Sequence, residues 1–163
     1  MKKILFALIT FFISSLLVFS QKEAKETFGL KIEESIKVDG FLDEPVWEKA
    51  TEISDFIQFE PERGKPASLT TTVKVLYDEN FIYFGFLCYD PQPDRIISRM
   101  TKRDAELTGD DAAVVFLDTF HDRRNCYFFV TNLLGTQLDG RIAENGLRRE
   151  TTWDGIWKSA GQK

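Results

Sequence analysis

Two tryptophans near the end of the chain, with an aspartate between them, could take part in ligand chemistry. Trp153 and Trp157 lie four residues apart in TTWDGIW, and Asp154 follows the first of them. An aromatic ring can stack on the C–H face of a sugar while a neighbouring carboxylate accepts hydrogen bonds from its hydroxyl groups. Trp153 and Asp154 are therefore candidate ligand-binding residues. The alternative is that the tryptophans pack across an open end of the fold.

A second polar group precedes the apolar run AAVVFLD. Arg103, Asp104 and Glu106 come shortly before the adjacent pair Asp110 and Asp111. Together these side chains could line a polar cleft, and we take Arg103 and Asp111 as candidates for ligand contact. The alternative is an ion-pair network on a connecting loop, which is the commoner use of such residues.

Acidic residues at both ends of AAVVFLD invite a metal or acid–base interpretation. Asp111 and Asp118 are seven residues apart, about 23 Å along an extended strand. They cannot share one ion, nor flank one glycosidic bond, whose two carboxylates lie about 5–9.5 Å apart. Calcium at either end would need roughly six to eight oxygen ligands, and turn capping is the alternative. His121, the single histidine, lies in the charged stretch TFHDRR without a selected nucleophile, so no catalytic residue is assigned.

Residues 1–20 have the features of an export signal. MKK is followed by the apolar run ILFALITFFISSLLVF, and Val18 and Ser20 occupy the small-residue positions before a cleavage site. A retained anchor is the alternative, although the run is shorter than the ~20 residues of a typical span. We predict export through the Sec pathway to the periplasm, the outer membrane or the medium, with no membrane span after the leader is removed.

The remaining residues, 21–163, are numerous enough for one domain with a sizeable core. Without the two leader lysines, 19 basic residues face 26 acidic ones, which leaves a net charge of −7. Such an acidic chain has no electrostatic reason to bind nucleic acid. Residues 21–35 are predicted to be a polar tether and the start of the first strand, and residues 36–163 the domain.

Most of the domain has the pattern of short β-strands. TTTVKVLYDENFIYFGFLCYD predicts two strands joined by a turn at Asp78-Glu79-Asn80, and both faces of the second strand are apolar, which predicts a central strand. ISDFIQFEP, AAVVFLD, NCYFFVTN and TQLDGRIAE predict further strands. LDEPVWEKA predicts one short helix capped by Asp43, with Trp47 and Ala50 on its buried face. The predicted fold class is an all-β antiparallel sandwich.

Cys88 and Cys126 both lie in apolar, strand-like runs. Export permits a disulfide between them, and two buried free thiols are the alternative. The spacing of these cysteines and His121 matches no familiar metal-ligand pattern.

Three segments together resemble a known family. IKVDGFLDEPVWEKA, VKVLYDENFIYFGFLCYDP and GDDAAVVFLD occur in the order and spacing of the exported domain related to carbohydrate-binding module family 9. The stretch from RDAELTGDD to TTWDGIW is similar to the form at the front of large bacterial exported proteins. The resemblance implies an antiparallel β-sandwich, sugar binding as an accessory to glycoside hydrolases, and bound calcium in some members.

Other residues stand in this chain at the sugar-binding positions of that family. Thr108 stands at the position of a stacking tryptophan, Val114 at that of a glutamate, and Phe129 at that of an arginine. The family domain also continues beyond WDGIWKSA, so we expect residues 36–163 to be an incomplete domain. The resemblance implies a non-catalytic carbohydrate-binding module of a larger polysaccharide-processing or envelope protein. A structural or interaction domain without the sugar site, or part of a glycoside hydrolase, are the alternatives.

Overall fold

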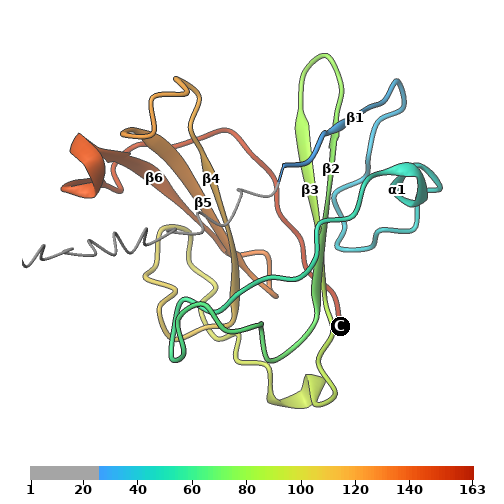
Figure 1. Ribbon diagram of the computed structural model, residues 1–163, viewed down its shortest axis with the longest axis horizontal. Coiled ribbons are helices and arrows are strands. Elements are labelled where there is room, and N and C mark those ends of the chain that lie inside the picture. Colours follow the sequence, from blue (N-terminus) through green and yellow to red (C-terminus); the bar gives the residue numbers. More distant parts are fainter. Residues whose placement is uncertain (1–25) are drawn as a thin grey trace, which may run out of the picture.

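The computed structural model describes residues 26–163, so the predicted export signal lies outside the described residues. The regular structure of this part of the chain consists mainly of two separate β-sheets (Figure 1). All neighbouring strands are antiparallel except β1 and β2. The first sheet has the order β1 (Leu30–Lys31), β2 (Thr71–Tyr77) and β3 (Ile82–Cys88), and the second has the order β4 (Ala112–Leu117), β5 (Cys126–Asn132), β6 (Gln137–Ala143) and β7 (Arg148–Glu150). The prediction of an all-β chain is confirmed.

The β2–β3 hairpin turns where the sequence predicts it. The Asp78 carboxylate accepts hydrogen bonds from the backbone N–H groups of Asn80 and Phe81, at 2.6 and 2.8 Å, and from the Tyr83 hydroxyl at 2.7 Å. Aspartate favours turns because its side chain can replace a backbone acceptor in this way. These bonds hold the pKa of Asp78 below its usual range, with the Tyr83 hydroxyl as the largest cause.

One short helix, α1 (Val46–Lys49), packs its buried residues against the first sheet. Pro45 stands at its N-cap without a side-chain hydrogen bond, so the prediction that Asp43 caps the helix is wrong. Glu44 lies at this end instead: its carboxylate accepts from the Trp47 indole N–H and from the Lys37 backbone N–H, both at 3.0 Å. A glutamate reaches farther than an aspartate, which allows it to bridge the helix and the preceding segment.

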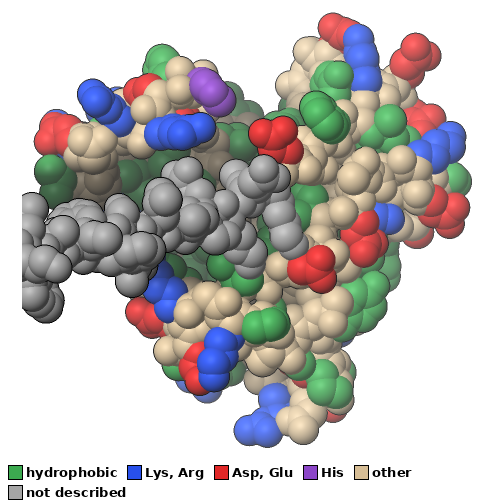
Figure 2. All heavy atoms as spheres, viewed as in Figure 1, with side chains coloured by type: hydrophobic (Ala, Val, Ile, Leu, Met, Phe, Trp, Pro, Cys, Tyr) green, Lys and Arg blue, Asp and Glu red, His purple; other side chains and the backbone are tan. Residues whose placement is uncertain are grey.

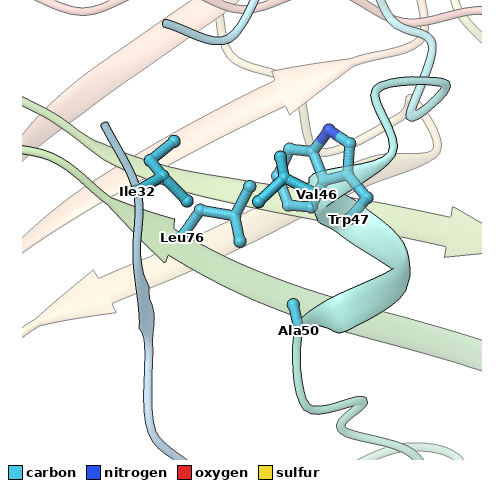
Figure 3. Packing of buried hydrophobic residues seen from close by; sticks show 5 residues of the cluster. All are labelled: Ile32, Val46, Trp47, Ala50 and Leu76. Carbon is cyan, nitrogen blue, oxygen red and sulfur yellow. The ribbon is translucent and has the colours of Figure 1, made fainter. Parts of the chain in front are cut away.

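The face of α1 predicted to be buried forms a core cluster. The side chain of Trp47 is 4% exposed, and Gly85 of β3 lies so close beneath it that an added Cβ would be 2.9 Å from the indole ring. Any larger residue at Gly85 would displace the tryptophan, so this glycine marks a place of close packing between the helix and the sheet. Figure 3 shows the members of this apolar cluster: Ile32, Val46, Trp47, Ala50 and Leu76.

The second sheet presents two different faces. Phe128 of β5 and Leu138 of β6 are buried with Leu107 on one face. Tyr127 and Phe129 alternate with Phe128 and so point to the opposite face. The buried clusters of the two sheets share no residue.

Four sequence-based predictions differ from the structure. The strand β3 is an edge strand of the described sheet rather than a central one, because only β2 pairs with it. Cys88 at its end is consequently exposed, Cys126 is partly buried, and neither forms a disulfide. ISDFIQFEP forms only isolated bridges, since Asp55 has a φ of +54° that interrupts the extended chain. The first strand, predicted to begin within residues 21–35 and to continue into the domain, is limited to Leu30–Lys31.

Among residues 26–163, no helix has the length and apolar character needed to cross a membrane. Acidic and basic side chains are interspersed over the face shown in Figure 2, with no large patch of one sign.

Candidate functional site

The segment after β7 packs its two tryptophans against the second sheet. The ring centroid of Trp153 lies 4.5 Å from that of Tyr127 and 6.0 Å from that of Phe129. Trp157 meets Phe129 edge to face at 5.3 Å. We call these four residues the aromatic row. Tilted and edge-on contacts of this kind are favourable geometries for aromatic pairs. The tryptophans therefore pack on one face of the second sheet, whereas the alternative drawn from the sequence places them across an open end of the fold.

A buried carboxylate lies beside the aromatic row. Asp139 of β6 is opposite Phe129 in the sheet, and its exposed fraction is 0%. One carboxylate oxygen accepts a hydrogen bond from Arg103 Nη2 at 2.6 Å, and the other accepts from the backbone N–H of Gly155. Burial of a charge is costly unless the charge is paired and hydrogen-bonded. Asp139 therefore fixes both Arg103 and the segment of Trp153 in place.

Arg103 links this buried group to the surface. Its Nη1 donates to the Gln137 side chain at 2.5 Å, and its Nη2 lies 3.7 Å from the carboxylate of Asp154. Asp104 lies 3.7 Å from its Nε. The side chains of Arg103, Asp104 and Asp154 are 38%, 40% and 70% exposed. We call Arg103, Asp104, Asp139 and Asp154 the polar corner.

The polar corner is the one place in residues 26–163 where three carboxylates could reach a common metal ion. Oxygens of Asp104, Asp139 and Asp154 lie within 4.8 Å of one another. However, the guanidinium group of Arg103 already lies among them, and Asp139 uses both oxygens for other partners. A cation here would replace Arg103 as the compensating charge. The residues do not fit calcium while Arg103 is in place.

The candidate Asp111 lies in a different arrangement, and its neighbour Asp110 is engaged with the backbone. Asp111 accepts from the Ile97 N–H at 2.7 Å and is not among the residues that contact Arg103. Asp110 accepts from the N–H groups of Arg99 and Met100 and from Asn132, at 2.8–3.0 Å. These bonds, first that from Met100 and then that from Asn132, hold the pKa of Asp110 below its usual range.

At the other end of β4, the aspartate likewise accepts hydrogen bonds from backbone N–H groups. Asp118 accepts from the backbone N–H groups of Asp122 and Arg123, at 3.2 and 2.7 Å, and so caps the loop that holds His121. His121 is exposed. These contacts match the turn-capping interpretation of the strand-end acids rather than metal coordination.

The three substituted positions of the family resemblance do not converge in the structure. Val115 is paired with Phe129 and shares its face of the sheet, so Val114 points to the face opposite that of Phe129. Thr108 is exposed, and its hydroxyl donates to Glu106 at 2.8 Å. Phe129 contacts both tryptophans of the aromatic row.

The structure therefore brings together Trp153, Asp154 and Arg103, and leaves Asp111 apart. The sequence did not lead us to select Gln137 and Asp139, whose side chains accept hydrogen bonds from Arg103. These two residues are two positions apart in TQLDGRIAE, so they lie on the same face of the predicted strand. An aspartate in the interior of a predicted strand indicates a buried carboxylate, and a buried carboxylate needs a partner.

No protein-family model matches this chain, and neither a curated protein nor a solved structure was found to be similar to it.

Proposed function

We propose that the chain is an exported, non-catalytic β-sandwich module that binds a poly- or oligosaccharide at the polar corner and serves a larger polysaccharide-processing or envelope protein. The observation that supports this most is the position of Arg103. Its guanidinium group is anchored by the buried Asp139 and lies 3.7 Å from Asp154, the residue that follows Trp153 in the chain. Donors, acceptors and an aromatic ring thus meet at one accessible place.

Sugar chemistry suits this combination. Hydroxyl groups both donate and accept, so a pyranose can bond to a guanidinium and to a carboxylate at once. The face of an aromatic ring complements the C–H face of the same sugar. Because Asp139 fixes Arg103 before the ligand arrives, less conformational freedom is lost on binding. The export signal predicted in residues 1–20 and the resemblance of the sequence to family 9 modules support the same proposal.

Calorimetric titration of the full chain against a panel of soluble glycans tests this function. We expect one glycan class to bind, and Asp154→Ala to weaken that binding by about tenfold, the effect of losing one good hydrogen-bonded contact. Asp94→Ala is the matched control, because Asp94 is also exposed and lies in another part of the chain. If no glycan binds, or if both variants bind equally well, the proposal fails.

A structural or interaction domain that lacks a sugar site is the second candidate. It is favoured by the contacts of Trp153 with Tyr127 and Phe129, which already use part of the indole surface. In that case Asp154→Ala changes neither stability nor any glycan affinity, and the role of the aromatic row is to close the sheet. Tryptophan fluorescence during the same titration separates the two candidates, because only a bound sugar alters the surroundings of Trp153.

Glycoside hydrolysis is a weaker third candidate. Two catalytic carboxylates need a separation of about 5–9.5 Å with the sugar between them. Carboxylate oxygens in the polar corner lie within 4.8 Å of one another, and Arg103 occupies the space. Turnover of a chromogenic glycoside that disappears in Asp104→Asn or Asp154→Asn would favour this candidate.

A further inference from the structure

Asn145 and Gly146 form an asparagine–glycine pair between β6 and β7. They lie in a short 3-10 helix, η2 (Glu144–Gly146), and both residues are exposed. The chain contains four asparagines, and Asn145 is the only one that a glycine follows. Asparagine is a thermally labile residue, because the backbone nitrogen of the next residue can attack its side-chain carbonyl carbon. Glycine leaves that nitrogen unobstructed, since it carries no side chain.

The surroundings of this pair are open. Apart from its chain neighbours, no heavy atom would lie within 4 Å of a Cβ added to Gly146. Within residues 26–163, no hydrogen bond holds the side-chain amide of Asn145. Asn145 and Gly146 also line an open cavity together with Arg123 and Arg124, so water has access to them. The side-chain carbon of Asn145 is therefore accessible both to a nucleophile and to water.

The other three asparagines lie in different surroundings. Asn80 is also exposed, but the backbone N–H of the residue after it, Phe81, donates to the carboxylate of Asp78 at 2.8 Å. Asn125 and Asn132 both donate hydrogen bonds from their side-chain amides, and Asn132 is only 3% exposed. Asn80 is therefore the closest comparison for Asn145, with equal access to water and a bonded, substituted nucleophile.

The reaction requires a local opening of the turn. The ψ angle of Asn145 is +36° in the folded chain, and it must rotate before the Gly146 nitrogen can reach the side-chain carbon. Two backbone bonds oppose this rotation: Asn145 N–H donates to Arg124 at 3.2 Å, and Leu147 N–H donates to Glu144 at 3.3 Å. Both distances are at the long end of the usual range. The turn leads to β7, a three-residue edge strand, and such segments open at lower cost than the core.

We propose that Asn145 is a site of spontaneous chemical modification, with the Gly146 backbone nitrogen as the nucleophile and water as the second reactant. The nitrogen loses its proton and bonds to Asn145 Cγ, the bond from Cγ to Nδ2 breaks, and Nδ2 takes up a proton and leaves as ammonia. Water then adds to either carbonyl carbon of the succinimide ring and breaks its bond to nitrogen. The products are aspartate and isoaspartate, and nothing is oxidised or reduced.

Isoaspartate changes the hairpin of β6 and β7. Its main chain runs through the former side-chain carbon, which adds one atom to the backbone between the paired residues Ala143 and Arg148. The register of a hairpin depends on the length of its turn. β7 leads on to Trp153 and Asp154, so the modification alters the strand that precedes this part of the polar corner. The reaction itself does not depend on the proposed sugar binding, because it involves only Asn145, its neighbour and water.

Mass spectrometry of the full chain after incubation at mildly alkaline pH tests the proposal. Trypsin releases residues 142–148 as one peptide, in which an amide NH2 should be replaced by OH at least about tenfold faster than at Asn80. Chromatography should separate two products, aspartate and isoaspartate. Hydroxylamine, which captures a succinimide, should split the chain between Asn145 and Gly146. Aspartate as the sole product would indicate direct hydrolysis and overturn the proposal.

Two matched variants test the role of the nucleophile. Gly146→Ala places a methyl group beside the attacking nitrogen and should slow the reaction at Asn145 by at least about tenfold. Gly64→Ala is the control, because Gly64 also has a positive φ, +86° against +90°, and equally open surroundings. It should leave the rate unchanged, and circular dichroism checks that both variants fold. Equal rates in the two variants, or a rate at Asn145 no higher than at Asn80, overturn the proposal. If Gly146→Ala does not fold, the hydroxylamine cleavage of the wild type decides.

Discussion

Different kinds of interaction stabilise the two sheets. Beneath α1, the apolar cluster of Ile32, Val46, Trp47, Ala50 and Leu76 contains no charged side chain. On the second sheet, the polar corner places the buried Asp139 between Arg103 and the backbone of Gly155. Apolar burial is non-directional and its effect scales with area. A buried ion pair depends on geometry, and it destabilises the fold when one partner is missing. The two regions should therefore respond differently to single substitutions.

Trp47→Ala should produce the largest loss of stability in the first sheet. Removal of a buried tryptophan leaves a cavity and loses apolar contact, so the free energy of unfolding should fall by about 3–5 kcal/mol. Urea denaturation measures this difference. Phe120→Ala is the control, because Phe120 is 70% exposed and should change stability by less than about 0.5 kcal/mol. A small effect of Trp47→Ala would contradict the assignment of the first core to this cluster.

Arg103→Met should be nearly as harmful in the second sheet, although Arg103 is partly exposed. Methionine keeps much of the apolar stem but leaves the buried Asp139 carboxylate without its cation, and we expect a loss of about 2–3 kcal/mol. Urea denaturation again measures the effect. Arg149→Met is the matched control, because its carboxylate partner, Glu106, is itself 64% exposed at 3.8 Å. That change should lower stability by less than about 1 kcal/mol. Equal losses in the two variants would show that burial of the partner does not matter.

A smaller effect should appear in the pH dependence of stability. Hydrogen bonds from Met100 and Asn132 lower the pKa of Asp110 in the folded chain. A lowered pKa contributes stability that is fully present above the unfolded value of about 4 and is lost as pH falls through the folded value. Asp110→Asn should therefore be less stable than the wild type near neutral pH, and its stability should fall less on acidification. Urea midpoints between about pH 2 and pH 6 measure this, and parallel curves for the two proteins would contradict it.

The sequence predicts the apolar region better than the polar one. The spacing of Trp47 and Ala50 on a short helix predicts which residues are buried, and Asp78 predicts the hairpin turn, because both signals are local. Arg103, Asp139 and Gly155 come from distant parts of the chain, so their contact depends on how the sheet places them. Trp153, Asp154 and Arg103 were selected by residue type, but their contact could not be derived. The edge position of β3 was missed because an apolar strand looks alike whether one or two neighbours cover it.

The coupling between Arg103 and Asp139 tests the central claim that the polar corner is held by the ion pair between Arg103 and the buried carboxylate of Asp139. Unfolding free energies of Arg103→Met, Asp139→Asn and the double variant give this coupling from a double-mutant cycle. We predict that the double variant is less destabilised than the sum of the single variants by at least about 1 kcal/mol, because each single change leaves the other partner uncompensated. Additive losses, with a coupling near zero, would contradict the claim.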